Sequence, residues 1–292
     1  MSILKTSLHI RSKHREPYDF KKLIGCCPNL KPYVFINQFG LQTLDFTNPL
    51  AVKTLNKALL QSHYQIDWDL PEPYLCPPIP SRADYIHYVA DLLSTLNDGI
   101  IPQGPKIRVL DIGVGANAIF PLIGHREYGW NFVGSEIDGR ALTISKNIVS
   151  KNHLSDCVDI RLQENKDHIF KGIIQEGESF EVSICNPPFH TSYEEARKAN
   201  LTKWKKLKIK TKALNFGGQS HELWYPGGEK AFIEKMIHES RQVNCRIFTC
   251  YVSKESSLSH LYTCLEQVGA IHLGTTTMKQ GQKTSRFIAW RF

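Results

Sequence analysis

The sequence lacks a long apolar run, which argues against a membrane-spanning helix. No stretch approaches the roughly 18 consecutive apolar residues that a span requires. Residues 1–15 are basic and include no apolar stretch of the kind found in signal peptides, so we expect no secretory leader. Internal repeats and low-complexity tracts are also missing, and the content of 41% apolar and 22% charged residues is ordinary for a globular protein.

Cysteine and histidine are present, but not in the spacings that bind metals. The eight cysteines are scattered, and no pair has the two-residue gap of a zinc knuckle or a redox dithiol. The twelve histidines include no pair one helical turn apart beside a third ligand. We therefore expect reduced thiols, a cytoplasmic protein and no bound metal.

Positive charge exceeds negative charge. The 36 Lys and Arg residues outnumber the 28 Asp and Glu residues, which gives a net charge of +8. A basic protein often meets a polyanion, although charge alone indicates only non-specific attraction. A chain of 292 residues predicts about two domains.

The C-terminal two thirds of the chain alternates short apolar strands with helices. This pattern predicts a mainly parallel sheet of seven strands with helices on both faces. The last two strands have no long crossover between them, so we expect an antiparallel pair at the end of the sheet. The expected strands are 107–111, 132–136, 158–162, 180–185, 245–252, 270–276 and 286–292, and the expected helices are 141–151, 229–241 and 256–268.

The first part of the chain has a different pattern. Helices are expected at 49–60 and 82–96, and prolines interrupt the chain between them. The pattern alone does not name a fold for this part. We predict an N-terminal helical extension, residues 1–104, and an α/β domain, residues 105–292, with an insertion at about 190–228.

An acidic residue and two glycines follow the first strand of the α/β domain. Asp111 ends the strand, and Gly113 and Gly115 stand at alternate positions after it. Glycine lets the backbone turn tightly and approach a ligand at the carboxyl end of a strand, where open α/β sheets bind. With Ala118 and Glu136, these glycines also satisfy the dinucleotide fingerprint, so a nicotinamide enzyme is one interpretation. A plain turn with helix-capping carboxylates is another.

Two carboxylates favour S-adenosylmethionine over a dinucleotide. Asp111 lies inside the strand end, where it can hold the cationic amino group of a methionine moiety and would repel a pyrophosphate. Glu136 closes the second strand and can accept hydrogen bonds from both ribose hydroxyls. The turn 163–167 follows the third strand, and Asp167 is the expected acceptor for the adenine amine.

The sequence Asn186-Pro187-Pro188-Phe189 follows the fourth predicted strand. A planar amine is a poor nucleophile because its lone pair is delocalised. The Asn186 side-chain oxygen and the Pro187 carbonyl can each accept one N–H, which orients the lone pair towards an electrophile. The two prolines make this carbonyl direction rigid, and Phe189 offers a face on which a planar base can stack. Two prolines can also simply end a strand.

The glycine turn and this tetrapeptide together resemble those of class I S-adenosylmethionine-dependent N-methyltransferases. Across nearly the whole chain, further motifs are similar to the large-subunit ribosomal RNA methyltransferase F family, which is related to the eukaryotic N6-adenosine RNA methyltransferases. The motifs are Pro80–His87, Asp111–Asn117, Ile119–Gly124, Asn215–Gly218, Glu222–Trp224, Gly227–Glu229 and Gly281–Trp290.

The resemblance implies a class I, Rossmann-like methyltransferase fold and methylation of the N6 amine of one adenine, at position 1618, in bacterial 23S ribosomal RNA. That RNA is expected either free or within a large-subunit assembly intermediate, with the enzyme a monomer. The resemblance also suggests that Arg82 reaches the carboxylate of the cofactor, although an arginine there can instead cap the following helix. The target adenine has to be unpaired or flipped to enter a pocket at the sheet edge.

A basic stretch follows the tetrapeptide and is expected beside the mouth of the site. Residues 197–212 include no acidic residue. Positive charge with an interleaved aromatic side chain suits phosphate contacts and stacking on an unpaired base. The predicted RNA contacts are Arg197, Lys198, Lys203, Trp204, Lys205, Lys206, Lys208 and Lys210, with Lys212 in the same run, and Arg11 and Lys13 in the N-terminal extension, which is expected to bind RNA and cover the cofactor site.

Other functions stay open on the residues alone. An Asn-Pro-Pro-aromatic motif also suits methylation of guanine N2, cytosine N4 or a protein glutamine amide, and only the resemblance separates the bases. A non-catalytic RNA-binding assembly factor would need a ruined tetrapeptide, which this chain does not have.

Overall fold

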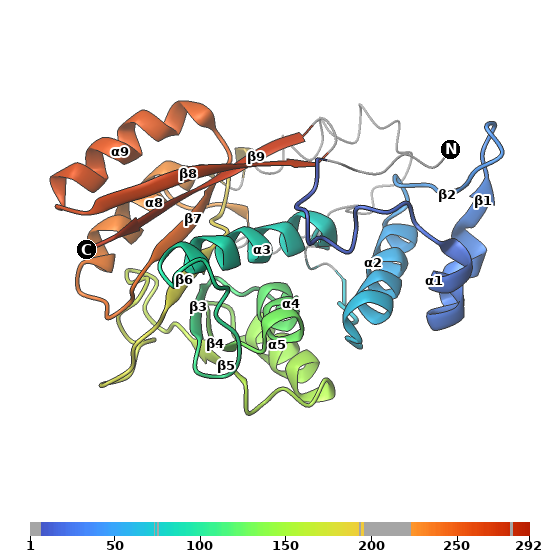
Figure 1. The fold of residues 1–292 in the computed structure, drawn as a ribbon, viewed down its shortest axis with the longest axis horizontal. Helices are drawn as coiled ribbons and strands as arrows, with labels where there is room; N and C mark the ends of the chain where they lie inside the picture. The colour runs from blue at the N-terminus through green and yellow to red at the C-terminus, as the bar shows by residue number, and fades with distance from the viewer. Residues whose placement is uncertain (1–6, 73, 75, 193, 196–222, 281–282) are drawn as a thin grey trace.

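A seven-stranded sheet with helices on both faces forms the centre of the molecule (Figure 1). The structure is a computed structural model that describes residues 7–292 except 73, 75, 193, 196–222 and 281–282. No helix within these residues is long and apolar enough to cross a membrane. The strands of the sheet are β3 Arg108–Ile112, β4 Asn131–Glu136, β5 Val158–Leu162, β6 Val182–Cys185, β7 Phe248–Val252, β8 Ile271–Gln280 and β9 Lys283–Arg291.

The topology of the sheet confirms the predicted fold class. Its strand order is β5-β4-β3-β6-β7-β9-β8. Strands β3 to β7 pair in parallel, and β9 lies antiparallel between β7 and β8. The chain adds β4 and β5 on one side of β3 and then returns to place β6 on the other side. Open α/β sheets bind ligands outside the carboxyl ends of the strands at such a switch point.

Each face of the sheet has its own apolar core. The helices are α3 Ile79–Thr95, α4 Ile119–Tyr128 and α5 Gly139–Lys151 on one face, and α8 Gly228–Ser240, the short helix η2 Glu255–Ser257 and α9 Leu258–Gln267 on the other side of the sheet (Figure 1). Side chains alternate along β3, so Val109 packs in the α3 core and Leu110 in the α8 core. Asp111 therefore points to the same side as Val109, towards α3.

The N-terminal extension begins as a small satellite beside the sheet (Figure 1). Its elements are α1 Phe20–Cys26, the short helix η1 Pro28–Tyr33, the hairpin strands β1 Val34–Ile36 and β2 Gln42–Leu44, and α2 Pro49–Tyr64. A separate apolar cluster holds them together and includes Phe20, Leu30 and Leu55. The helix α3 belongs instead to the core of the sheet, so the extension reaches the switch point through α3.

Gly124 on α4 lies directly against the ring of Phe132 on β4, and this contact gives a stability prediction. A Cβ atom at this position would overlap the ring of Phe132 on β4, with Cε2 only 2.9 Å away. We expect Gly124→Ala to lower the free energy of unfolding by about 1–3 kcal/mol, because overpacking displaces a core aromatic ring. Urea denaturation measures this. The control Gly139→Ala, where nothing lies within 4 Å, should change stability by less than about 0.5 kcal/mol.

Candidate active site

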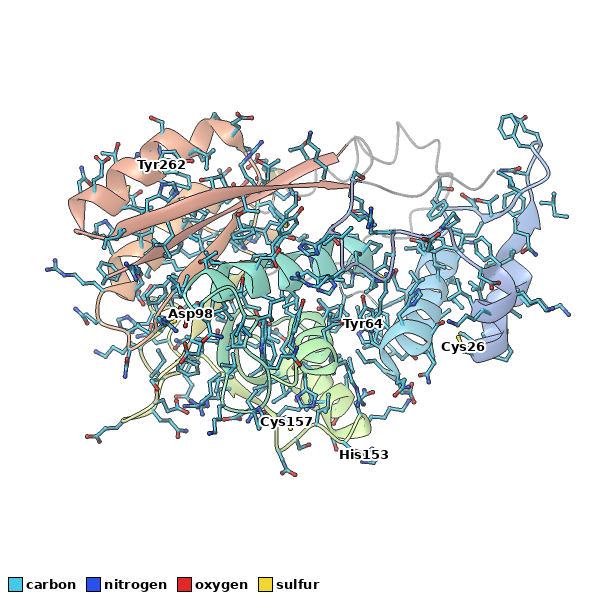
Figure 2. All side chains as sticks on the ribbon, in the orientation of Figure 1. Cys26, Tyr64, Asp98, His153, Cys157 and Tyr262 are labelled. Carbon is cyan, nitrogen blue, oxygen red and sulfur yellow. The ribbon has the colours of Figure 1, made fainter. Side chains whose placement is uncertain are left out.

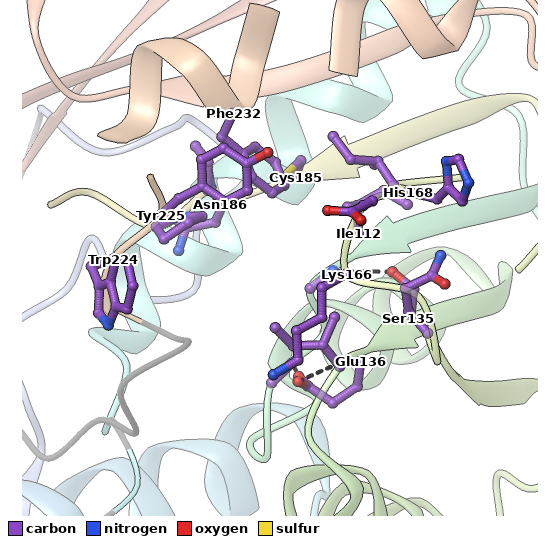
Figure 3. A pocket seen from close by; sticks show the side chains of 18 of the residues that line it. Ile112, Ser135, Glu136, Lys166, His168, Cys185, Asn186, Trp224, Tyr225 and Phe232 are labelled. Atoms are coloured by element: carbon purple, nitrogen blue, oxygen red, sulfur yellow. Dashed lines mark hydrogen bonds between the residues drawn. The ribbon is translucent and has the colours of Figure 1, made fainter. Parts of the chain in front are cut away.

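A pocket of about 500 Å³ opens at the carboxyl ends of β3, β4 and β6. Five segments form its wall: the turn after β3, the end of β4, the loop after β5, the residues that follow β6, and 224–232 (Figure 3). The predicted site residues that line it are Gly113, Gly115, Glu136, Asp167, Asn186, Pro187 and Pro188. The residues predicted to hold a cofactor and those predicted to hold an amine therefore share one cavity.

The turn after β3 has the geometry for which glycine is suited. Gly113 and Gly115 have φ angles of 73° and 66°, in the left-handed region that other residues rarely adopt. The N–H of Gly113 donates to Ser135 Oγ at 3.3 Å, and that of Gly115 donates to Glu136 Oε2 at 2.9 Å. The ends of β3 and β4 are thereby fixed to each other around the pocket.

Glu136 organises this side of the pocket as well as lining it. Its Oε1 accepts hydrogen bonds from the N–H groups of Ile137 and Asp138, at 2.8 Å and 3.0 Å. Its other oxygen holds Gly115. The carboxylate is held in one orientation by backbone donors, and carboxylate oxygens can accept further hydrogen bonds. This arrangement suits the predicted contact with ribose hydroxyls.

Asp111 is a buried carboxylate beside the pocket. It is 1% exposed, and neither of its oxygens has a hydrogen-bond partner among the described residues. Burial raises the pKa of Asp111 well above its ordinary value, the nearby Glu136 raises it further, and the positive charge of Arg82 acts in the opposite direction. An acidic group without a partner fits a cationic ligand group and would repel a pyrophosphate.

Arg82 projects from α3 towards this carboxylate. Its guanidinium lies over the rings of Phe120 and Tyr251, with the carbon atom 5.6 Å and 5.4 Å from the two centroids. These stacking contacts hold a positive charge near Asp111. Neither Arg82 nor Asp111 lines the pocket. The carboxylate and the guanidinium have the charges that suit the amino group and the carboxylate of a methionine moiety, and these two contacts stay predictions.

The loop after β5 closes the pocket on the cofactor side. Asp167 lines the pocket with Lys166 and His168 (Figure 3). Gln163 Nε2 donates to the backbone oxygen of Lys171 at 2.9 Å, and its Oε1 accepts from the N–H of Asn165 at 3.1 Å, which gives the loop its shape. The contact of Asp167 with the adenine amine stays a prediction.

Asn186 stands at the other side of the pocket, directly after β6. Asn186, Trp224, Tyr225 and Phe232 all line the pocket (Figure 3). The sequence did not single out the three aromatic residues as site residues. Phe189 is half-buried and does not line the pocket, so its stacking role stays a prediction.

A buried glutamate fixes the aromatic wall. Glu229, in the first turn of α8, is 4% exposed and accepts hydrogen bonds from the N–H and hydroxyl of Ser253, at 2.7 Å and 2.9 Å. Burial raises the pKa of Glu229. Because Ser253 directly follows β7, this contact sets the position of the start of α8, on which Phe232 is carried.

The two predicted RNA contacts in the extension already have protein partners. Arg11 donates to Asp91 at 2.7 Å, to the backbone oxygen of His87 at 2.8 Å and to the Tyr128 hydroxyl at 3.1 Å. These bonds tie the N-terminal segment to α3 and α4. Lys13 pairs with Glu127 at 2.6 Å. The remaining predicted RNA contacts, in 197–210, lie outside the described residues.

The fold and the pocket define a class I methyltransferase. The model of a family described as RNA methyltransferase matches residues 2–292, and the chain belongs to this family. It is similar to the ribosomal RNA large subunit methyltransferases F of Cytophaga hutchinsonii, at 52% identity over 99% of this chain and 92% of the relative, and of Pseudomonas syringae pv. syringae, at 48% over 99% and 90%.

Solved structures agree with this assignment. The catalytic domain of human METTL16 in complex with an RNA hairpin of the MAT2A 3'UTR superposes with a TM-score of 0.83 and 31% identity, covering 98% of this chain and 96% of that one. The N-terminal domain of human METTL16 in complex with SAH has a TM-score of 0.76 and 29% identity, covering 98% of both chains.

Proposed function

We propose that this protein transfers the methyl group of S-adenosylmethionine to the N6 amine of one adenine, at position 1618, in 23S ribosomal RNA. The observation that carries the proposal is that Asn186 and Pro187 share one pocket with Glu136 and the glycine turn, beside the unpartnered Asp111. Family membership and the names of the bacterial relatives support it. The substrate is 23S RNA, free or within an assembly intermediate, and the protein acts as a cytoplasmic monomer.

The residues on the β3 and β4 side bind the methyl donor. When bound, this donor supplies an electrophilic methyl group on a positively charged sulfur, so no covalent nucleophile of the protein is needed. Asp111 receives the amino group, and Arg82 receives the carboxylate. Glu136 accepts hydrogen bonds from the ribose, and Asp167 accepts one from the adenine amine. The preorganised backbone contacts of Glu136 keep its carboxylate in place before binding.

The residues after β6 hold the amine. The Asn186 side-chain oxygen and the Pro187 carbonyl each accept one N–H of the target, and the rigid Pro187-Pro188 backbone keeps the two acceptors fixed. Holding both protons aims the lone pair at the methyl group. As the N–C bond forms, the S–C bond of the donor would break to leave a neutral thioether, and one of the two N–H protons would be released to solvent. The aromatic residues of the pocket wall offer faces on which the target base stacks. Phe189, which lies beside the pocket, would need to turn towards it to share in this stacking.

The RNA approaches over a basic surface. A base that enters this pocket has left its stack, so the target is unpaired or flipped. The insertion 197–212 and the N-terminal extension bind the backbone around it, and the extension covers the cofactor site. The influence of Arg82, on α3, on the pKa of Asp111 supports this part of the proposal.

The basic insertion gives a binding prediction. We expect the triple variant Lys203→Ala, Lys205→Ala, Lys206→Ala to bind RNA roughly 10- to 100-fold more weakly at physiological salt, because three phosphate contacts are lost. The slope of log K against log salt should become shallower by about 2–3. The Kd of S-adenosylmethionine should stay unchanged. Filter binding at several salt concentrations and calorimetry measure these quantities.

A matched control removes the same charge elsewhere. Lys106, Lys146 and Lys279 are exposed, and replacing all three with alanine lowers the net charge equally. RNA affinity should fall much less in this control than in the insertion variant. Equal losses in the two triple variants would show that only net charge matters and would remove the insertion from the binding surface.

Mass spectrometry of ribosomal RNA nucleosides tests the proposed reaction. Deleting the gene should remove N6-methyladenosine from one site in 23S RNA, and the wild-type gene should restore it. If the deletion instead removes a methylated guanine, a methylated cytosine or the methyl group of a protein glutamine amide, the pocket acts on another planar amine. No change in any methylation would indicate a non-catalytic RNA-binding factor.

A further inference from the structure

Three potential metal ligands meet between α8 and α9, outside the pocket. His260 and Cys264 lie one helical turn apart on α9, and Glu234 approaches them from α8. The His260 Nε2 atom is 3.1 Å from Glu234 Oε2 and 3.4 Å from Cys264 Sγ. All three ligand atoms lie within 4.8 Å of one another, and in the part of the chain that the structure describes no other such group is found.

These distances are close to those of a tetrahedral zinc site. Zn–N, Zn–O and Zn–S bonds of about 2.0–2.3 Å at tetrahedral angles place N and O about 3.4 Å apart and N and S about 3.6 Å apart. The observed 3.1 Å and 3.4 Å differ from these values by a few tenths of an ångström. Small rotations of the side chains are enough to admit the ion.

We propose that Glu234, His260 and Cys264 bind one Zn²⁺, with water as the fourth ligand. Thiolate and imidazole favour zinc over the harder Mg²⁺ and Ca²⁺. The side chains of Glu234 and His260 are 40% and 38% exposed, so the ion and its water have access from solvent. Cys264 is 2% exposed and supplies its sulfur from the interface between the helices.

The proposed ion would crosslink two helices on the far face of the sheet. α8 also carries Phe232 into the pocket wall, so zinc would stabilise the helix that forms part of the active site. No two cysteines have the two-residue gap of a zinc knuckle and no two histidines lie one helical turn apart, so the sequence predicted no bound metal. A mixed His–Cys pair whose third ligand comes from another helix does not form either of these spacings.

Cobalt binding to the metal-free full chain tests the proposal, because Co²⁺ takes the same ligands as Zn²⁺ and absorbs light. The wild type should bind one Co²⁺ per chain with a thiolate-to-cobalt charge-transfer band, and Zn²⁺ should displace it. Cys264→Ala should abolish the band. His260→Gln, at a half-exposed position where folding is not at risk, should weaken Co²⁺ binding by more than about tenfold, a loss that even outer-shell changes produce.

Cys26→Ala is the matched control. Cys26 is an exposed cysteine on α1, and Figure 2 shows it at the opposite end of the molecule from Tyr262 on α9. This variant should keep the band and the affinity of the wild type. A wild type without the band, a band that survives Cys264→Ala, or one that disappears in Cys26→Ala would overturn the proposal. Because metal binding needs no RNA, the result does not depend on the proposed methylation.

Discussion

Replacing Asn186 with alanine should lower kcat for methyl transfer to RNA on the order of 10³-fold, while the Kd values of RNA and S-adenosylmethionine change less than about threefold. The side-chain oxygen of Asn186 is one of two proposed acceptors for the amine protons, and the other is the backbone carbonyl of Pro187, which mutation leaves in place. Without Asn186 the amine can rotate, and its lone pair is no longer aimed at the methyl group. Single-turnover assays measure the rate, and calorimetry measures the affinities.

Asn186→Asp is the matched variant for this experiment. It keeps an acceptor oxygen of the same size at the same place and should therefore retain more activity than Asn186→Ala. An Asn186→Ala variant that turns over at the wild-type rate would contradict the proposed mechanism. Loss of RNA affinity equal to the loss of rate would assign Asn186 to binding alone.

The fold was predictable where the pattern is local. The parallel strands β3 to β7 are short segments rich in apolar residues, and the helices between them recur in alternation. The last two strands are longer and more polar, but no crossover separates them. The parallel sheet and its antiparallel end were therefore correctly predicted. The helix α4 was not predicted. Residues 119–124 are almost entirely apolar and include Pro121 and Gly124, so they show no helical period. Only its last turn has polar residues, 125–127, and all of 119–124 is buried, so the apolar and polar residues do not alternate with a helical period.

The hairpin β1–β2 was also not predicted, because its strands are too short and too exposed to show a pattern. Its strands have three residues each, which is too short for an alternating pattern. Phe35 and Ile36 are adjacent and both exposed. The turn between the strands depends instead on the Asn37 side chain, which accepts hydrogen bonds from the N–H groups of Phe39 and Leu41. Local apolar pattern therefore carries little information about this hairpin.

The site shows the same division between local and distant contacts. The sequence indicated the glycine turn and residues 186–188, which line the pocket, because each is a few consecutive residues directly after a strand. The aromatic residues of the wall could not be predicted from the sequence, because 224–232 is separated from the tetrapeptide by the insertion. Its position depends on the bond between Glu229 and Ser253, two residues on different elements whose pairing follows from how α8 packs beside β7.

Asp111→Asn should change stability and cofactor binding in opposite directions. The carboxylate is buried without a partner, so removing its charge should raise the free energy of unfolding by about 1–2 kcal/mol at neutral pH. The same change removes the acceptor for a cationic amino group. We expect the Kd of S-adenosylmethionine to rise roughly 10- to 100-fold, which corresponds to a charge-assisted hydrogen bond of about 1.5–3 kcal/mol. Urea denaturation and calorimetry measure the two effects.

The pH dependence separates this interpretation from a general packing effect. The pKa of Asp111 is raised in the folded protein, chiefly by burial, so between the unfolded value of 3.8 and the folded value the native state binds more protons than the unfolded chain. Its contribution to stability therefore decreases as the pH rises through this window, and Asp111→Asn should remove that decrease.

Asp98→Asn is the control. Asp98 lies in an exposed turn where its φ angle is 51°, so this change should leave stability, the pH dependence of stability and the affinity for the cofactor unchanged. An Asp111→Asn variant that is less stable than the wild type at neutral pH, or that binds S-adenosylmethionine as tightly, would show that the carboxylate has a partner inside the protein and is not held ready for the ligand.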